Sequence, residues 1–341
     1  MKRQAVFFTG RSRVEVREET VPAPGSGEVL VATRCSAISA GTELLFFRGE
    51  APRTVPVDET HSSLAASLEY PLKYGYAAAG QVIGVGRGVT PEWKGRHVFA
   101  FNPHETHFIA NVKDVTPLRD ELSPDEAVFF PNMETAVMLV ADGAPLIGER
   151  VVVFGQGVVG LLVTSLLARF PLQALVTLDR YPIRRETSLQ FGGQASIDPA
   201  PPDAHEAVLA LLSAGGTHAG ADLAFELSGH PGALDAAIAV TGFHGRVVIG
   251  SWYGTKHVEL DLGGRFHRSR IRLIASQVSR INPEISGRFD KARIGDVAWR
   301  MIEAIRPAQL VTHRFPVERA AEAYRLLDER PEEALQVVFT Y

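Results

Sequence analysis

Short runs of the kind that form β-strands alternate with turn residues in the first third of the chain. They cover residues 4–8, 14–16, 28–31, 81–85, 97–100 and 107–110, and glycine and proline separate them. Short apolar runs bounded by such turn residues are typical of β-strands. The pattern therefore predicts an irregular, mostly β domain up to about residue 122.

The pattern changes to apolar runs from residue 151 onward. Residues 151–154 are entirely apolar, as expected for a parallel strand that is buried on both faces. We expect further strands at 174–178, 223–226, 246–249 and 271–275, and helices at 158–170 and 231–239. Strands that alternate with helices predict right-handed crossovers and a doubly wound parallel sheet.

Helical patterns flank this region on both sides. Ser123 precedes Pro124, Asp125 and Glu126, which predicts an N-cap with proline and acids in the first turn of a helix. We expect this helix to continue, with a break, through 134–141. Further elements should be a helix at 294–305, an extended segment at 310–315, a helix at 317–327 and a strand at 335–339. The last strand is expected to return to the first domain.

Composition and charge exclude several classes of protein. The 341 residues suffice for two domains, and 45% apolar with 22% charged residues is ordinary for a globular protein. A net charge of −4 argues against nucleic-acid binding, although residues 265–272 form a basic run. No apolar stretch is long enough to cross a bilayer. The single cysteine, Cys35, fits a reducing cytoplasm, where we expect the protein to reside.

The strongest local signal is a glycine-rich turn after the first apolar strand. Residues 151–160 read Val-Val-Val-Phe-Gly-Gln-Gly-Val-Val-Gly. Gly155 permits a tight turn, Gly157 allows a pyrophosphate to approach the backbone, and Gly160 lets the helix pack near the strand. The free N–H groups of the helix start, at Val158 and Val159, favour phosphate. This segment therefore predicts a dinucleotide-binding Rossmann domain.

An acid at the end of the next strand indicates which dinucleotide is bound. Asp179 lies where it can accept hydrogen bonds from both adenosine ribose hydroxyls, which favours NAD over NADP. Arg184 is expected over the adenosine ribose, although such arginines more often lie on a solvated helix face. Ligands sit beyond the carboxyl ends of parallel strands, so later strand ends should face the nicotinamide half. The cofactor residues expected there are Ser228, Gly229, Gly250 and Ser251, together with Thr135 from the preceding helix.

With these motifs in place, the chain resembles the medium-chain dehydrogenase/reductase superfamily. The matching segments are 22–31, 80–86, 155–160, 226–229 and 242–250. The resemblance implies an α/β protein with a GroES-like catalytic domain at 1–132 and 280–341. A Rossmann domain would be inserted at 133–279, with the active site in the cleft between the domains. Segments 36–43, 72–76, 131–136 and 154–160 are similar to the subgroup around the bacteriochlorophyllide a dehydrogenase, which oxidises a 3-hydroxyethyl group.

The sequence departs from the zinc alcohol dehydrogenases at every metal ligand that the resemblance implies. Their first-ligand cysteine falls near Ser39, their histidine falls on Tyr76, and the third ligand falls at Pro131 or Asn132. Zinc requires three protein ligands around an open position, so we expect no metal. A different site built from Glu43, His104, His107 and Glu134 is conceivable, but such histidines are more often packing or surface residues.

Without zinc, the developing alkoxide needs hydrogen-bond donors and the proton needs a relay. The resemblance places Thr42 at the relay hydroxyl and Glu43 at an acid that orients the site. Tyr76 replaces a zinc ligand, Asn132 can donate to a substrate oxygen, and His104 is a candidate general acid or base. For Glu43, Asn132 and His104, the structural alternatives are an internal salt bridge, a turn cap and a packing role. Tyr70, Tyr74, Phe46, Phe47, Trp252 and Tyr253 either wall a broad apolar cleft or lie in the core.

The first functional hypothesis is a zinc-free, NAD-dependent alcohol dehydrogenase or carbonyl reductase that acts on a fairly bulky small molecule. The alternatives are a zinc-free quinone or enone reductase and a non-catalytic NAD-binding regulator. We also expect a homodimer, because the resemblance implies that the edge of the Rossmann sheet near residues 271–275 lies at a dimer interface.

Overall fold

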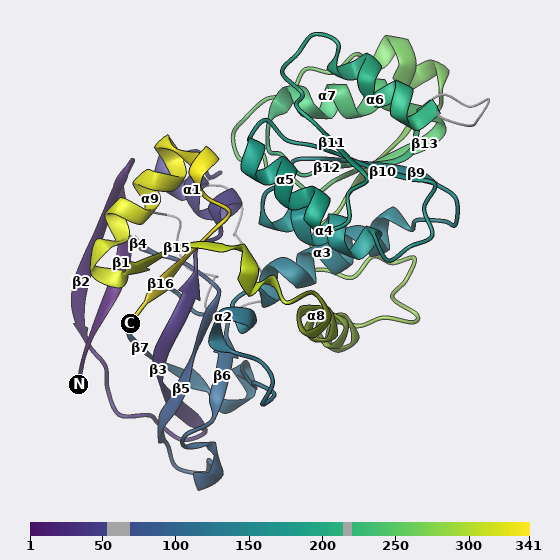
Figure 1. Ribbon diagram of the computed structural model, residues 1–341. Helices are drawn as coiled ribbons and strands as arrows, with labels where there is room; N and C mark the ends of the chain where they lie inside the picture. Colours follow the sequence, from purple (N-terminus) through teal and green to yellow (C-terminus); the bar gives the residue numbers. More distant parts are fainter. Residues whose placement is uncertain (53–68, 214–219) are drawn as a thin grey trace. The chain divides into compact units, whose positions relative to one another are not determined.

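The computed structural model describes residues 1–52, 69–213 and 220–341. These residues form two compact units (Figure 1). Unit 1 comprises Met1–Pro131 and Ile302–Tyr341, and unit 2 comprises Asn132–Met301. The chain therefore leaves unit 1, builds unit 2 and returns to unit 1 through helix α8 (Lys291–Ile305). Within the described ranges, every helix is too short or too polar to cross a membrane.

Unit 1 is built on two β-sheets. The larger sheet has the order β15-β16-β3-β5-β6-β8, and β7 also pairs with β3. A smaller sheet has the order β2-β1-β4. The strands are β1 (Lys2–Gly10), β2 (Arg13–Thr20), β3 (Glu28–Ala37), β4 (Leu72–Lys73), β5 (Ala78–Val85), β6 (His97–Ala100), β7 (His107–Asn111), β8 (Val115–Pro117), β15 (Val311–Pro316) and β16 (Gln336–Thr340).

The last strand returns to the first domain, as predicted. β16 pairs antiparallel with β3, with Val338 opposite Ala37 and Thr340 opposite Cys35. Helix α2 (Pro124–Ala127) also matches the sequence pattern, because the Ser123 hydroxyl accepts the N–H of Glu126 at 3.2 Å. A break separates α2 from α3 (Phe130–Gly143).

Helix α1 (Ala40–Arg48) was not predicted, although it carries two of the candidate site residues. Its residues Glu43–Phe47 are all buried, so the segment lacks the apolar periodicity that identifies an amphipathic helix. The helix ends at Gly49, whose φ of +70° permits the left-handed cap. Helix α9 (Ala320–Glu329) packs against α1 and β2 and follows a short 3-10 turn at Val317–Arg319.

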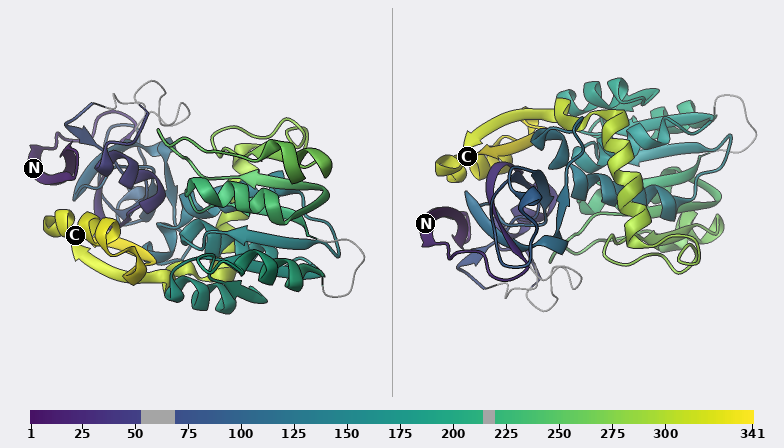
Figure 2. Two further views of the ribbon diagram at one scale, coloured as in Figure 1. Left: turned by 90° about the horizontal axis from the view of Figure 1, so that it is seen from above. Right: turned by 90° about the horizontal axis from the view of Figure 1, so that it is seen from below.

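Unit 2 is a doubly wound Rossmann domain. Its sheet has the order β11-β10-β9-β12-β13-β14, and all neighbouring strands run parallel. Helices lie over the sheet in the view from above and in the view from below (Figure 2). The strands are β9 (Arg150–Phe154), β10 (Ala174–Leu178), β11 (Ala195–Ile197), β12 (Ala221–Glu226), β13 (Thr241–Ile249) and β14 (Arg272–Ala275). The helices are α4 (Val158–Leu167), α5 (Pro182–Gln190), α6 (Ala204–Ser213) and α7 (Pro231–Val240).

The core of unit 2 lies between the sheet and its helices. Val152, Val176 and Ala224 from the central strands pack with Leu234 and Ile238 of α7. Two local expectations need adjustment. Helix α4 ends at Leu167 instead of residue 170, and the edge strand β11, which is short and only half-buried, was not predicted.

Candidate active site

The turn between β9 and α4 has the shape that the glycine motif predicts. Gly155 has a φ of +90°, and a Cβ at this position would lie 2.6 Å from the backbone of Ser228. A Cβ at Gly160 would lie 2.0 Å from the carbonyl oxygen of Gly155. Both glycines are therefore required by the packing of the protein itself.

Gly157 differs from its two neighbours in the motif. It has an ordinary φ of −67°, and a Cβ added there would meet no atom within 4 Å. Gly157 is also the N-cap of α4, and no side chain caps this helix end. The first N–H groups of a helix, here including Val158 and Val159, have no partner within the helix. The open space beside Gly157 and these donors together fit a pyrophosphate.

Asp179 lies at the end of β10 and is tied to the glycine turn. Its carboxylate accepts the backbone N–H of Gln156 at 2.8 Å and that of Tyr181 at 2.9 Å. Each carboxylate oxygen has further acceptor capacity, and 7% of the residue is exposed. The Arg184 guanidinium lies 3.8 Å from Asp179 Oδ2 and 4.9 Å from the centre of the Tyr181 ring. The residues expected at the adenosine end are thus brought together.

A second polar network lies at the carboxyl ends of β12 and β13, where the sequence placed the nicotinamide half. Ser228 donates to the buried Glu226 carboxylate through its N–H at 2.8 Å and its hydroxyl at 2.5 Å. Ser251 Oγ accepts the N–H of Gly229 at 2.8 Å. Tyr253 donates to Glu226 at 2.5 Å. Burial, then the adjacent Glu226, raises the pKa of Tyr253 above its usual range.

Sequence reasoning did not include Glu226 and Tyr253 among the cofactor residues. Glu226 is 0% exposed and ends the predicted strand directly before Ser228. The sequence signal was an acid at the end of an apolar strand, directly before Leu-Ser-Gly. Such an acid is seldom fully buried unless it has hydrogen-bond partners. Gly250 lies at the end of β13 and donates its N–H to the Glu226 carbonyl at 3.0 Å. Ser228, Gly229, Gly250 and Ser251 therefore share one hydrogen-bonded network with Glu226.

Three hydroxyl groups meet in unit 1, two of them at positions that resemble zinc ligands and the third at the position of the relay hydroxyl. The Tyr76 phenol donates to Ser39 Oγ in a short hydrogen bond and lies 3.4 Å from Thr42 Oγ1. Ser39 is the N-cap of α1, and Thr42 lies in its first turn. Burial raises the pKa of Tyr76 to about 12, while the bonds to Ser39 and Thr42 oppose the rise. We call Ser39, Thr42 and Tyr76 the hydroxyl cluster; Ser39 is its unpredicted member.

Glu43 and His104 lie behind this cluster and are both 0% exposed. Their side chains contact each other, with 3.0 Å between Glu43 Oε2 and His104 Nε2. Glu43 also accepts a short hydrogen bond from Tyr324. Burial, then Glu43, raises the pKa of Tyr324 well above its usual value. In this geometry neither Glu43 nor His104 has surface with which to touch a substrate.

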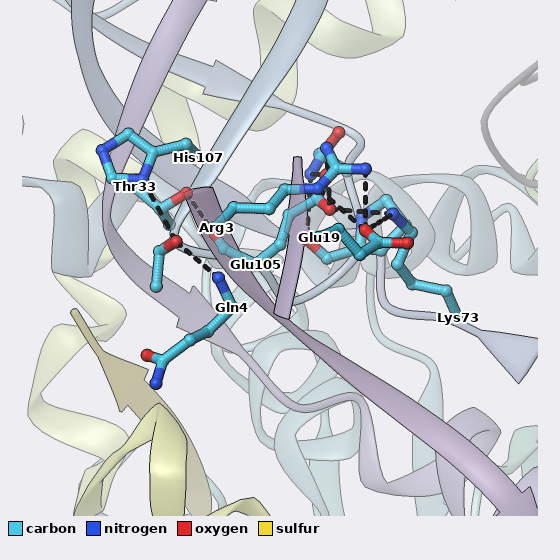
Figure 3. Close-up of polar contacts among 10 residues, drawn as sticks. Arg3, Gln4, Glu19, Thr33, Lys73, Glu105 and His107 are labelled. Atoms are coloured by element: carbon cyan, nitrogen blue, oxygen red, sulfur yellow. Dashed lines mark hydrogen bonds and ion pairs between the residues drawn. The ribbon is translucent and has the colours of Figure 1, made fainter. Parts of the chain in front are cut away.

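The loop that carries His104 is anchored by charged and polar contacts (Figure 3). Glu105, which is 3% exposed, pairs with Arg3 at 3.1 Å and with Lys73 at 2.9 Å. Thr33 Oγ1 donates to the Glu105 carbonyl at 2.6 Å. Val6 N–H donates to the carbonyl of His104 itself at 2.9 Å. These bonds fix the backbone of the loop against β1 and β3.

The remaining candidates lie on α3 and on β7. Asn132 is 9% exposed and begins unit 2, where Thr135 follows it on α3. Glu134 pairs with Lys291 at 2.8 Å. His107 contacts Thr106 Oγ1 at 3.1 Å, and burial, then the N-terminal amino group, lowers its pKa.

These placements bear on a metal site. Among residues 1–52, 69–213 and 220–341, no group of three or more His, Cys, Asp or Glu lies together to hold a metal ion. Of the residues weighed above for a different site, Glu134 pairs with Lys291 within unit 2, and His107 contacts Thr106 within unit 1. Hydroxyl groups at the positions of Ser39 and Tyr76 also do not match the thiolate and imidazole ligands that zinc takes in alcohol dehydrogenases.

Three aromatic residues that were considered for a substrate cleft lie in the core instead. Phe46, Phe47 and Tyr74 are 2%, 5% and 3% exposed. Phe47 stacks on Tyr324 with 5.8 Å between ring centres, and Phe46 lies 4.4 Å from the ring centre of Tyr74. These rings hold α1 in place within unit 1.

Comparisons with known proteins agree with this architecture, although no family model matches the chain. The chain is 25% identical to YphC of Escherichia coli K12, a zinc-type alcohol dehydrogenase-like protein, and the match covers 95% of each chain. It is 22% identical to the D-guloside 3-dehydrogenase of the same strain, over 93% of each chain. It is 26% identical to the (R,R)-butanediol dehydrogenase of Bacillus subtilis 168, over 70% of this chain and 73% of the relative.

Solved structures show the same fold. The 2R,3R-butanediol dehydrogenase from Bacillus subtilis superimposes with a TM-score of 0.79, at 20% identity and 99% coverage of both chains. An alcohol dehydrogenase from Escherichia coli CFT073 in complex with NADH gives a TM-score of 0.78, at 18% identity, over 100% of this chain and 99% of that one. A protein described as a zinc-binding dehydrogenase from Sinorhizobium meliloti 1021, bound to NADP, gives 0.77 at 19% identity and 100% coverage of both chains. In sequence and in fold, the chain is therefore similar to dehydrogenases of the alcohol dehydrogenase-like type, and this similarity supports an oxidoreductase that uses a pyridine nucleotide.

Proposed function

We propose that the protein is an NAD-dependent alcohol dehydrogenase or carbonyl reductase that works without a catalytic zinc. The hydroxyl cluster carries this proposal. Tyr76 and Ser39 occupy positions that resemble metal-ligand positions, and their hydroxyls bond to each other. Such groups suit the donation of hydrogen bonds to an oxygen atom better than the coordination of zinc.

The residues of unit 2 fit a bound dinucleotide. Gly155, Gly157 and Gly160 with the N–H groups of Val158 and Val159 would hold the pyrophosphate, and Asp179 with Arg184 would hold the adenosine. Thr135 and the network around Ser228, Gly229, Gly250 and Ser251 would hold the nicotinamide half. When bound, the nicotinamide supplies or accepts the hydride. The Asp179 carboxylate favours NAD, because a 2′-phosphate would meet a like charge.

The residues of unit 1 would handle the substrate oxygen. Negative charge on this oxygen grows as the carbonyl carbon accepts hydride, so a donor aimed at the oxygen stabilises the transition state of reduction more than the bound ketone. We assign this role to the Tyr76 phenol, whose pKa burial raises to about 12, so that it keeps its proton. On substrate binding the phenol would turn its single hydrogen from Ser39 Oγ to the substrate oxygen. Thr42 adjoins the phenol and would pass the proton onward. Asn132 stays a candidate second donor.

The substrate class proposed is a secondary alcohol or its ketone on a fairly bulky small molecule. The relatives are named for a guloside oxidised at carbon 3, for butanediol and for threonine oxidised at carbon 3. Each name denotes a secondary alcohol. A substrate like that of the bacteriochlorophyllide subgroup would also be a secondary alcohol, and this narrower assignment stays a prediction.

A substrate panel tests the proposal. Secondary alcohols with NAD, and ketones with NADH, should change the NADH absorbance, and chelators should leave the rate unchanged. Turnover with quinones or enones alone would replace the proposal by the reductase alternative. Binding of NADH without turnover in either panel would favour the regulator. Stoichiometric zinc that is required for turnover would overturn the zinc-free mechanism.

We also propose a homodimer formed through the edge of the Rossmann sheet. Strand β14 is the last strand in the sheet order, and its Leu273 and Ile274 are only half-buried. An edge strand with apolar side chains suits pairing with a second copy. Sedimentation equilibrium should give twice the chain mass, and a monomer would contradict the proposed dimer.

A cytoplasmic location without membrane or nucleic-acid partners likewise stays a prediction.

A further inference from the structure

One buried pair connects the two segments of unit 1 that carry the hydroxyl cluster. Glu43 Oε1 accepts the backbone N–H of Ser39 at 2.8 Å, which holds the start of α1. Glu43 Oε2 contacts His104 Nε2 at 3.0 Å. The His104 ring packs directly on Gly75, where a Cβ would lie 2.7 Å from the ring. Gly75 immediately precedes Tyr76, so the pair spans from Ser39 to Tyr76.

Both ring nitrogens of His104 are held. Nδ1 lies 2.7 Å from Ser36 Oγ, which in turn lies 2.6 Å from the Tyr341 hydroxyl. Nε2 lies 3.0 Å from Glu43 Oε2, so each ring nitrogen has its own polar partner. The Tyr324 hydroxyl donates to the same carboxylate oxygen. The ring therefore has one orientation in which all these bonds are made at once.

Burial separates this pair from the chemistry itself. Glu43 and His104 are 0% exposed, whereas Ser39, Thr42 and Tyr76 are partly exposed. The Phe339 ring closes over His104 with 5.0 Å between ring centres. The backbone of the loop is anchored at Glu105 and Thr33 (Figure 3). A group sealed on all sides cannot exchange a proton with a substrate, but it can hold its neighbours in place.

We propose that Glu43 and His104 form a positioning pair that sets the Tyr76 phenol against Ser39 and Thr42. Ser36, Tyr341 and Tyr324 complete the pair by holding the imidazole and the carboxylate. The pair acts on the reaction only through Tyr76. This effect on turnover rests on the function proposed above, but the effect on Tyr76 itself does not.

A spectroscopic test therefore comes first, because it needs no substrate. In protein labelled with ¹³C at tyrosine Cζ, the signal of Tyr76 is identified by its loss in Tyr76→Phe. Glu43→Gln replaces one carboxylate oxygen by an NH2 donor, which must face either the Ser39 N–H or the Tyr324 hydroxyl, so one of these two bonds is lost. The Tyr76 signal should shift or broaden. An unchanged Tyr76 signal in folded Glu43→Gln would overturn the proposal.

Matched variants separate positioning from general loss of stability. Glu149→Gln removes another paired carboxylate, which holds Arg246 at 2.8 Å in unit 2. It should lower stability and leave the Tyr76 signal in place. Where Glu43→Gln does not fold, Tyr324→Phe removes one donor and keeps the ring that packs on Phe8 and Phe47. This variant should also shift the Tyr76 signal, and a Tyr76 signal that does not move would again overturn the proposal.

A double-mutant cycle gives the kinetic consequence. Glu43→Gln should lower kcat about tenfold or more in the wild-type background and less than about twofold in Tyr76→Phe, because coupled residues are not additive. NADH affinity, measured by fluorescence, should stay unchanged. Equal losses in both backgrounds would show a role independent of Tyr76 and would overturn the proposal. If wild-type protein turned over no alcohol or ketone, the proposed function would fail, and the tyrosine signals would still decide the positioning role.

Discussion

The open space beside Gly157 leads to a sharp prediction about Gly157→Ala. The substitution adds one methyl group at a residue with φ of −67° and ψ of −177°, which alanine adopts without strain. A Cβ there meets no protein atom within 4 Å. Alanine for glycine at a compatible position stabilises a protein by about 0.4–1 kcal/mol, through the unfolded chain. Thermal unfolding of the free protein should therefore occur at the same or a slightly higher temperature.

Cofactor affinity should behave in the opposite way. If the pyrophosphate packs against the backbone at Gly157, the methyl group must displace it from the N–H donors of α4. Each hydrogen bond to a charged group contributes about 1.5–3 kcal/mol. Because about 1.4 kcal/mol corresponds to a tenfold change in Kd, the loss of one such bond should weaken NADH binding about 10- to 100-fold.

The control is a second glycine of the same motif. In Gly160→Ala the new Cβ would lie 2.0 Å from the Gly155 carbonyl oxygen, where ordinary contact begins at 3.4 Å. Overpacking of this kind costs about 1–3 kcal/mol of stability. NADH fluorescence titration and thermal unfolding should therefore separate the variants: Gly160→Ala is destabilised, whereas Gly157→Ala is stable and binds poorly. NADH affinity within twofold of wild type in Gly157→Ala would refute the reasoning.

Four further predictions concern the two halves of the site. Asp179→Ala should narrow or reverse the preference for NAD over NADP, measured by paired titrations. A wild-type protein that prefers NADP would show that the neighbouring arginines, and not Asp179, decide the cofactor preference. Tyr76→Phe should lower kcat about 10²-fold, which is the scale for the loss of one donor to a developing oxyanion, and should leave NADH affinity unchanged. A kcat close to that of the wild type would make Tyr76 a packing residue. Burial raises the pKa of Tyr76 to about 12, so its phenol keeps its proton through pH 10. Up to that pH, the dependence of kcat/KM on pH should therefore have the same shape in the wild type and in Tyr76→Phe. Elemental analysis should give far less than one zinc per chain; a stoichiometric amount would contradict the expectation.

The glycine turn and the strand-end acid of the proposed cofactor half could be predicted from the sequence because their signals are local. The strand, the glycine turn, the helix and the acid at the next strand end all lie within residues 151–179, and a turn that requires glycine has a steric cause that a short segment contains. The parallel sheet followed from apolar runs alternating with helical segments. Asp179 bonds Gln156, only 23 positions away, so even this contact lies within one βαβ unit.

The substrate half could not be predicted in this way, because only the tertiary structure brings its residues together. Thr42, Glu43, Tyr76 and His104 could be singled out by type and by resemblance, but not sorted into exposed and sealed groups. Glu43 meets Tyr324 across 281 positions, and Ser36 meets Tyr341 across 305. These contacts exist because β16 pairs with β3 and brings the end of the chain beside α1. Periodicity reports which face of an element is buried, whereas the partner that a buried polar group finds depends on elements distant in the chain.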